Sequence, residues 1–268
     1  MKVVGVIPAR YNSTRFEGKV IADLLGKPII QHVYEKAKAA RLLDDLIVAA
    51  DDDRVVKIVK DFGGKVIYTS PKQPTGSDRI AEVVNPLDVK IVINIQGDEP
   101  LIEPKMIDEL ARVLLNDEKL VMATLVKKIN NPEDINNPNV VKVVIDRAGF
   151  ALYFSRFPIP YVRIGDSLIA AAAEAMPNEA GRAKNIVYYK HIGLYAYTKD
   201  FLFTFTNLPP SPLEEAEELE QLRALEYGYK IKTVETEFET VGVDTPQDLE
   251  KAKETLTSSR KAENAKNS

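Results

Sequence analysis

The sequence predicts an α/β protein with a doubly wound, mostly parallel but mixed sheet and a smaller second sheet region. Short apolar runs at residues 2–8, 46–50 and 91–95 are nearly continuous, which is typical of strands covered on both faces. After the first run, apolar residues recur at helical spacing over residues 29–40. Strands and helices therefore alternate along the first half of the chain, which is the order of a doubly wound layer.

Further elements follow the same reasoning. Segments rich in β-branched or aromatic residues are expected to be strands at residues 65–68, 120–126, 140–146, 151–155, 189–197 and 230–234. Helices are expected around residues 105–115 and along an apolar stripe at residues 213–225. Three aspartates, Asp51, Asp52 and Asp53, precede a helical segment and are interpreted mainly as helix caps.

The chain is expected to form a single α/β domain over residues 1–256. An excursion at about residues 161–187 is rich in Gly, Ala and Arg and is assigned no secondary structure, and a flap and a subunit contact are both open as its role. Residues 257–268 are polar and lack apolar periodicity, so they are predicted to be a frayed C-terminal tail.

Composition excludes several classes of protein. The 268 residues are 45% hydrophobic and 28% charged with a net charge of -4, which indicates a soluble globular protein and gives no bulk charge for nucleic acid. The absence of cysteine excludes thiolate chemistry, and two histidines, His32 and His191, argue against a multi-histidine zinc site. No apolar segment reaches the roughly 18 residues of a membrane span, so we expect a cytoplasmic protein without a membrane partner.

The segment IVINIQGDEP at residues 91–100 reads as a buried strand that ends in an acidic turn. Gly97 permits a sharp turn, and Asp98 and Glu99 then lie at the carboxyl end of the strand, where open α/β sheets place ligands. Mg²⁺ prefers one or two carboxylates together with water and phosphate oxygens. An ordinary turn with solvated acids explains these ten residues equally well. Asp244, in a turn before the last helix, repeats the arrangement.

The loop ARYNSTRFEGK at residues 9–19 follows the first strand and is rich in hydrogen-bond donors. Arg10, Arg15 and Lys19 carry positive charges, and Ser13 adds a hydroxyl, which suits a polyphosphate. The loop matches neither the P-loop nor the Rossmann glycine pattern, and a solvated basic loop is the alternative.

A second polar turn, TSPKQPTGS at residues 69–77, precedes a helix. Gly76 and Ser77 allow a close backbone approach of a ligand to this turn. Arg79 lies in the first helical turn, where its charge opposes the helix dipole, so an anionic partner would explain its position.

Eight segments together resemble the 3-deoxy-manno-octulosonate cytidylyltransferase family, also called CMP-Kdo synthetases, over about residues 3–256. They are IPARYNSTRFEGK (7–19), LLGKPII (24–30), TGSDR (75–79), NIQGDEP (94–100), YFSR (153–156), KHIGLY (190–195), LEQLR (219–223) and GVDTP (242–246). The resemblance implies a nucleotidyltransferase-like fold and a homodimer. It implies transfer of CMP from CTP to the anomeric hydroxyl of 3-deoxy-D-manno-octulosonate (Kdo) for lipopolysaccharide synthesis, with release of pyrophosphate and a requirement for Mg²⁺.

The same resemblance assigns roles to individual residues. Asp98 and Asp244 would bind the metal and, with Lys19 and Arg10, would be catalytic. The nucleotide-binding set is Pro8, Ala9, Arg10, Ser13, Arg15, Lys19, Gly76, Ser77 and Gln96. The set for the sugar acid is Arg79, Gln96, Arg156, His191, Tyr195, Glu220 and Gln221. Without the resemblance, His191 would be interpreted as a packed strand histidine.

Other functions remain open from the sequence. The acceptor could be 8-amino-Kdo or another keto sugar acid, because enzymes for different acids share the nucleotide half of the site. A metal-dependent glycosyltransferase would also place an aspartate at a strand end, although the basic loop suits a triphosphate better than a sugar diphosphate. A noncatalytic nucleotide-binding regulator would keep the loop and lose a metal carboxylate, whereas both Asp98 and Asp244 are present.

Overall fold

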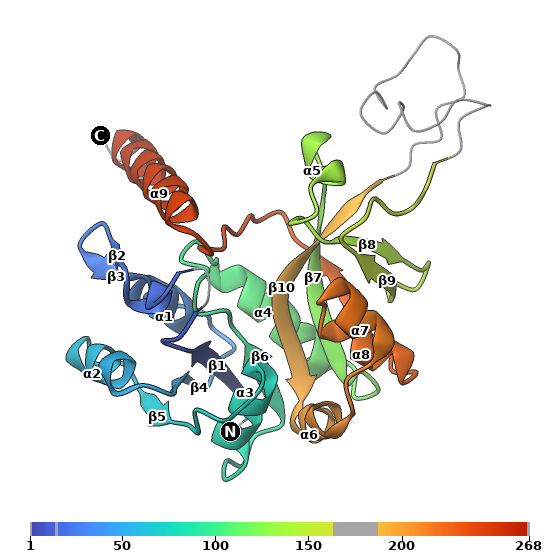
Figure 1. The fold of residues 1–268 in the computed structure, drawn as a ribbon, viewed down its shortest axis with the longest axis horizontal. Coiled ribbons are helices and arrows are strands. Elements are labelled where there is room, and N and C mark those ends of the chain that lie inside the picture. The colour runs from blue at the N-terminus through green and yellow to red at the C-terminus, as the bar shows by residue number, and fades with distance from the viewer. Residues whose placement is uncertain (1, 14–15, 163–186, 267–268) are drawn as a thin grey trace.

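The structure, a computed structural model, describes residues 2–13, 16–162 and 187–266 (Figure 1). Within these residues, nine strands form one mixed sheet, and a small second sheet pairs β2 (Asp23–Leu24) with β3 (Lys27–Pro28). The main path of the large sheet runs β11 (Lys232–Glu235), β7 (Met122–Lys128), β10 (Tyr189–Thr198), β6 (Ile91–Asn94), β1 (Val3–Ala9), β4 (Asp45–Ala50) and β5 (Val66–Tyr68). Off this path, β8 (Lys142–Ile145) pairs with β10 and with β9 (Ala151–Ser155).

The strand directions confirm the predicted doubly wound, mixed α/β fold. Strand β1 pairs in parallel with both β4 and β6, β4 pairs in parallel with β5, and β11 in parallel with β7. Strand β10 runs antiparallel to β6, β7 and β8 and joins the two parallel parts. The strands of the second half thus extend the main sheet, and the smaller sheet belongs to the first half.

Helices cover both faces of the sheet, as Figure 1 shows. In β1, Val3 and Ile7 belong to one buried cluster, whereas Val4 and Val6 belong to the other, because successive side chains point to opposite faces. The first cluster receives side chains from α1 (Ile29–Lys38), α2 (Asp53–Asp61), α4 (Pro104–Asn116) and α9 (Pro246–Lys266). The second receives them from α3 (Gly76–Val84), α6 (Lys199–Asn207) and α8 (Gln221–Glu226).

The single helix expected over residues 213–225 is wrong: the structure has two short helices. Helix α7 (Pro212–Glu217) begins after Ser211, whose backbone N–H donates to Glu214 Oε2 at 3.2 Å, and it is followed by Glu218, whose φ of 52° is left-handed. Helix α8 follows after this break. The change of direction buries Leu219 and Leu222 while Leu213 stays 39% exposed, so the apolar stripe does not face one surface.

In the structure, α9 continues through Lys266, into the segment predicted to be a frayed tail. The segment from residue 257 contains Arg, Lys, Ala and Glu, which propagate a helix at little cost once it has been nucleated. Of the three aspartates before α2, Asp52 caps the helix by accepting a hydrogen bond from the Arg54 N–H at 2.9 Å. Asp53 lies in the first turn, and Asp51 has another role that is described below.

The elements not yet given are η1 (Lys19–Ile21) and α5 (Glu133–Asn136). In the part of the chain that the structure describes, no helix is both long and apolar enough to span a membrane. The excursion at residues 161–187 falls almost entirely outside the described residues.

Candidate active site

The turn after β6 lies against the end of β1, at the carboxyl edge of the sheet. Parallel pairing places Val6 of β1 opposite Asn94 of β6, so the two following loops leave from the same edge. A Cβ atom on Gly97 would lie only 2.8 Å from the Pro8 carbonyl oxygen, so only glycine permits this approach. The loop after β1, predicted to bind the nucleotide, and the turn after β6, predicted to bind the metal, are therefore in contact.

Lys19 joins the two predicted metal carboxylates. Its Nζ donates to an Asp98 carboxylate oxygen and, at 2.8 Å, to Asp244 Oδ1. The backbone N–H of Val243 donates to the Asp98 carbonyl at 2.9 Å, which fixes the last turn against the β6 turn. Burial opposes the charge on Lys19, but the two carboxylates outweigh it and raise its pKa. Asp98 and Asp244 lie 79 and 225 positions after Lys19 in the sequence, and they form one cluster with it in the structure.

This cluster fits a hard divalent cation. Two carboxylates from different turns converge on one ammonium group, so a positive charge is already accommodated between them. Among the described residues, no group of three or more His, Cys, Asp or Glu side chains has metal-binding geometry. Two protein carboxylates are nevertheless the number that Mg²⁺ uses when substrate phosphates and water complete its shell.

Glu99 is a further acidic residue at this edge, and the family resemblance assigned it no role. Burial, followed by the charge of Asp98, raises the pKa of Glu99 to about 8. A hydrogen bond with Thr240 links its side chain to the segment that leads to Asp244. Its other oxygen, Oε2, is buried without a partner. The signal in the sequence was its position next to Asp98 in the acidic turn.

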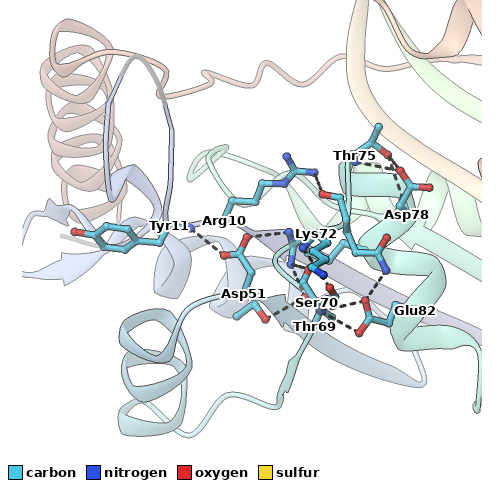
Figure 2. A network of polar contacts seen from close by, with 12 residues as sticks. Arg10, Tyr11, Asp51, Thr69, Ser70, Lys72, Thr75, Asp78 and Glu82 are labelled. Carbon is cyan, nitrogen blue, oxygen red and sulfur yellow. Dashed lines mark hydrogen bonds and ion pairs between the residues drawn. The ribbon is translucent and has the colours of Figure 1, made fainter. Parts of the chain in front are cut away.

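A groove of about 410 Å³ is lined by residues from three parts of the chain, among them Arg10, Gly76 and Glu220. Gly76 lies close to Pro8, since a Cβ atom at Gly76 would be 3.5 Å from Pro8 Cγ. The Arg10 guanidinium donates to the Gln73 carbonyl at 3.1 Å, which directs the side chain toward the turn before α3 (Figure 2). The loop after β1 and the turn before α3, which both contain predicted nucleotide-binding residues, therefore border one surface.

Ser77 and Glu220 meet at the N-terminus of α3. The Ser77 hydroxyl donates to Glu220 Oε2 at 2.8 Å, and burial raises the pKa of Glu220. Glu220 Oε1 and Gln221 Nε2 are buried without hydrogen-bond partners. Buried polar atoms are normally satisfied, so these two groups are available to a polar ligand. The break before α8 produces this arrangement, which a continuous helix would not give.

Gln96 lies between β6 and an irregularity in β10. Its Nε2 donates to the Gly193 carbonyl at 3.0 Å, where the pairing of β10 with β7 shifts register between Ile192 and Tyr195. A Cβ atom on Gly193 would lie 3.8 Å from Glu99 Oε1, so the irregular strand also borders the acidic turn. Register shifts of this kind commonly re-aim side chains next to active sites.

His191 and Tyr195 belong to an aromatic group on β10. The His191 ring lies 5.0 Å from that of Phe154 and 5.3 Å from that of Tyr195. Thr124 Oγ1 donates to the Leu194 carbonyl and lies 2.9 Å from His191 Nε2, so we assign the proton of the imidazole to Nε2. Burial lowers the pKa of His191 to about 3, which makes its imidazole neutral at pH 7.

This pKa predicts how acid affects stability. Histidine in the unfolded chain, with a pKa of 6.5, binds a proton below that pH, whereas His191 in the folded protein binds one only near pH 3. The neutral state of His191 therefore lowers the free energy of unfolding progressively as the pH falls below 6.5 and has no such effect above it. The loss is at most about 1.4 kcal/mol per pH unit. His191→Phe keeps the aromatic packing and is expected to abolish this slope. Urea unfolding at pH 6.5 and 5 measures it, and equal slopes for both proteins would contradict the prediction.

Two arginines assigned to the sugar acid have internal partners instead. The Arg79 side chain is 0% exposed and pairs with Asp51 Oδ2 at 2.8 Å, so the anion that explains its position belongs to the protein. Arg156 donates from Nε to the Glu217 carbonyl at 2.7 Å and from Nη1 to the Pro138 carbonyl. The structure therefore gives Arg79 no surface for a ligand, and it gives Arg156 a role in holding α7.

The other predicted residues are placed as follows. Ala9 ends β1 and is fully buried, which leaves only its backbone for a ligand. Ser13 lies in the loop after β1, and no hydrogen bond of its side chain is found in the described part of the chain. Arg15 lies outside the described residues.

Comparison with known proteins identifies the family. A family model described as cytidylyltransferase matches residues 4–231. The 3-deoxy-manno-octulosonate cytidylyltransferase of Geotalea uraniireducens (strain Rf4) is 51% identical over 256 residues, 96% of this chain and 99% of that protein. The chain belongs to the 3-deoxy-manno-octulosonate cytidylyltransferase family. The enzyme of the same name from Geobacter sulfurreducens (strain ATCC 51573 / DSM 12127 / PCA) is 49% identical over 96% of this chain and 100% of its own length.

Solved structures agree with this assignment. The structure of CMP:2-keto-3-deoxy-manno-octonic acid synthetase complexed with CTP is 42% identical, with a TM-score of 0.85 over 97% of this chain and 100% of the other. A 4-diphosphocytidyl-2C-methyl-D-erythritol synthase from Anaerococcus prevotii DSM 20548 is 15% identical over 96% of this chain and 99% of its own length, with a TM-score of 0.58, and shares the fold. The predicted family, fold class and cytidylyltransferase activity are confirmed.

Proposed function

We propose that the protein activates 3-deoxy-D-manno-octulosonate with CTP to give CMP-Kdo and pyrophosphate. The observation that carries this proposal is the convergence of Lys19, Asp98 and Asp244 at the carboxyl edge of the sheet. The cluster belongs to a chain 51% identical to an enzyme named for this reaction. The product would serve lipopolysaccharide synthesis in the cytoplasm.

The reaction is a displacement at the α-phosphorus of CTP. The anomeric hydroxyl oxygen of the sugar acid forms a bond to the α-phosphorus, the bond to the bridging oxygen of the β-phosphate breaks, and pyrophosphate leaves with its electron pair. The hydroxyl proton is released to solvent. Negative charge develops on the nonbridging oxygens and on the leaving group, so catalysis depends on positioning and electrostatic stabilisation. Arg10 and Lys19 supply positive charge on the side of the triphosphate.

Asp98 and Asp244 would hold Mg²⁺, the cofactor that the chemistry of the two carboxylates favours. When bound, the ion would neutralise charge on the phosphate and lower the pKa of an oxygen bound to it. The protein's own part is to hold both carboxylates at one point through the Val243 to Asp98 backbone bond. This arrangement requires no histidine base, which agrees with the neutral, packed state of His191.

The acceptor would lie near the unsatisfied polar groups of Glu220 and Gln221, with Gln96, Tyr195 and His191 nearby on the β6 and β10 side. An 8-amino form of the same sugar is the second candidate. Glu220 supports it, since a partly buried carboxyl group without a partner for Oε1 can accept from an ammonium or amine as well as from a hydroxyl.

Pyrophosphate release in the presence of CTP tests the proposal. Release that requires both CTP and a 3-deoxy-2-keto sugar acid supports it. A glycosyltransferase would release no pyrophosphate from CTP, and a noncatalytic regulator would bind CTP without turnover. Either of these outcomes would reject the proposed activity.

Lys19→Ala and Arg10→Ala are expected to act on CTP and not on the sugar acid. Each variant loses one cation that faces the triphosphate, so KM for CTP should rise or kcat should fall by about 10-fold or more, as for loss of a hydrogen bond to a charged group. The acceptor KM should stay within about twofold. Steady-state kinetics with each substrate varied provide the measurement, and Lys27→Ala, on an exposed lysine paired with Glu35, is the matched control. A rise in the KM of the sugar acid alone would show that this loop acts on the acceptor and not on CTP.

We also predict a homodimer. Large apolar side chains are exposed on and near β9 and at the start of β10: Leu152 is 60% exposed, Phe157 75%, Tyr161 62% and Val187 46%. Such a surface is typical of a protein interface, and twofold association is the commonest form. Light scattering at micromolar concentration should give twice the chain mass of 29.9 kDa. A mass of one chain would reject the dimer.

A further inference from the structure

Asp51 and Arg79 form a buried ion pair next to the loop that follows β1, the proposed nucleotide loop at residues 9–19. Arg79 Nη2 donates to Asp51 Oδ2 at 2.8 Å, and the exposed fractions of the two side chains are 0% and 13%. Arg79 Nη1 also donates to Thr69 Oγ1 at 2.5 Å and to the Ser70 carbonyl at 3.3 Å. The pair therefore ties the end of β4 to α3 and to the turn after β5.

The second carboxylate oxygen of Asp51 reaches the nucleotide loop. Asp51 Oδ1 accepts a hydrogen bond from the backbone N–H of Tyr11 at 3.2 Å (Figure 2). The carbonyl of the same Tyr11 accepts from the N–H of Gly18 at 2.9 Å, so one peptide unit on each side of Tyr11 is fixed. Gly18 directly precedes Lys19, and Arg10 directly precedes Tyr11. The contact with Asp51 therefore lies where the two ends of the loop meet, at Tyr11 and Gly18, between the proposed phosphate-binding cations Arg10 and Lys19.

The Tyr11 side chain packs where the two ends of the loop meet, between Gly18 and Arg54. Gly18 has a φ of 69°, which favours glycine, and a Cβ atom there would lie 3.2 Å from the Tyr11 ring, so a larger residue would push against this ring. The Arg54 guanidinium stacks on the ring at 3.3 Å from its centroid. Backbone and side chain of Tyr11 are thus both held by groups that do not themselves face the groove.

We propose that Asp51 is a positioning residue for CTP: its buried pairing with Arg79 holds the carboxylate that fixes Tyr11, and thereby sets the spacing between Arg10 and Lys19. The inference rests on the proposed function only in naming the ligand. Two buried charges recover little net stability compared with a well-packed apolar pair. A fixed, charged acceptor for a loop N–H is something that an apolar pair does not supply.

The test compares Asp51→Asn with the matched control Asp53→Asn. Both changes remove one negative charge from the same turn, but Asp53 is exposed and in the first turn of α2. We expect the Kd of CTP, measured by calorimetry, and the KM for CTP to rise at least 10-fold in Asp51→Asn. The acceptor KM should change less than twofold, and Asp53→Asn should match the parent protein. A purely structural role would lower the melting temperature and leave the KM for CTP of the folded protein unchanged.

A second variant guards against simple loss of folding, because Asp51→Asn leaves the Arg79 charge buried without its partner. Asp51→Asn combined with Arg79→Met removes both charges and keeps a side chain of similar length. We expect this variant to fold, as judged by circular dichroism, and still to bind CTP at least 10-fold more weakly than the parent. Parental CTP affinity in either folded variant would overturn the proposal. Failure of both variants to fold would also overturn it, since the pair would then serve stability.

Calorimetry also separates this inference from the proposed function. If the parent protein binds CTP but releases no pyrophosphate with any acceptor, the proposed reaction is wrong while the role of Asp51 is still measured. If the parent protein does not bind CTP at all, both are wrong.

Discussion

Asp98→Asn and Asp244→Asn are each expected to lower kcat by about 100-fold or more while CTP still binds. Removal of one preorganised electrostatic group from a transition state typically costs about 2.7 kcal/mol or more, which corresponds to this factor. Both carboxylates converge on Lys19, so each variant should leave that ammonium with one partner and the fold intact. The loss should therefore appear in turnover and not in stability.

Turnover, CTP binding and Mg²⁺ dependence should be measured together. The concentration of Mg²⁺ at half-maximal activity should rise in both variants, because each removes a charged ligand. Asp88→Asn is the matched control, since Asp88 is exposed and lies shortly before β6. Near-parental kcat in both site variants would show that the two carboxylates do not form the catalytic centre.

The convergence of Asp98 and Asp244 was expected from the family resemblance, and the rule about sheet edges accounts only for Asp98, which follows β6, because Asp244 lies well past the end of β11 at Glu235. Residues that follow buried parallel strands meet at one edge, and the apolar run before Asp98 marks such a strand. The sequence also placed Lys19 near the same ligand. It did not show that Lys19 bridges the two carboxylates, because that contact depends on how the loop after β1 closes at Gly18.

Arg79 shows the limit of local reasoning. Its position against the helix dipole correctly indicated an anionic partner. The choice between a ligand and a protein carboxylate depends on a contact with Asp51, 28 residues away, and on complete burial, neither of which has a local signature. Asp51 was misread for the same reason, since an aspartate before a helix is a good cap whether or not it has a distant partner.

The second half was predicted less well because its geometry depends on tertiary packing. Strand β10 is inserted antiparallel between β6 and β7, and residue pattern alone does not give strand order. The break between α7 and α8 occurs at Glu218 in a left-handed conformation, which favours glycine or asparagine and has no signal at a glutamate. That break is nevertheless what brings Glu220 to Ser77.

The sugar acid is expected to be selected strongly, because the proposed acceptor region contains buried polar groups without partners. Glu220 Oε1 and Gln221 Nε2 are two such groups. A site that hydrogen-bonds particular hydroxyls rejects analogues that leave its polar groups unpaired, and discrimination can reach ~10⁴. The octulosonate should therefore be used far better than the nine-carbon N-acetylneuraminate, whereas its 8-amino form differs at one group and should be the nearer competitor.

The decisive measurement is kcat/KM with CTP for the octulosonate, its 8-amino form and N-acetylneuraminate side by side. We expect the octulosonate to exceed neuraminate by up to ~10⁴. Gln221→Leu removes an amide of similar size from the acceptor region, so it should reduce this ratio by lowering the value for the octulosonate more than that for neuraminate. Gln31→Leu, on a glutamine of α1 that bonds Glu35, is the control for the same change elsewhere. If neuraminate is the best substrate of the three, the roles of His191, Tyr195, Glu220 and Gln221 are wrong, and if the 8-amino form is best, the second candidate replaces the first.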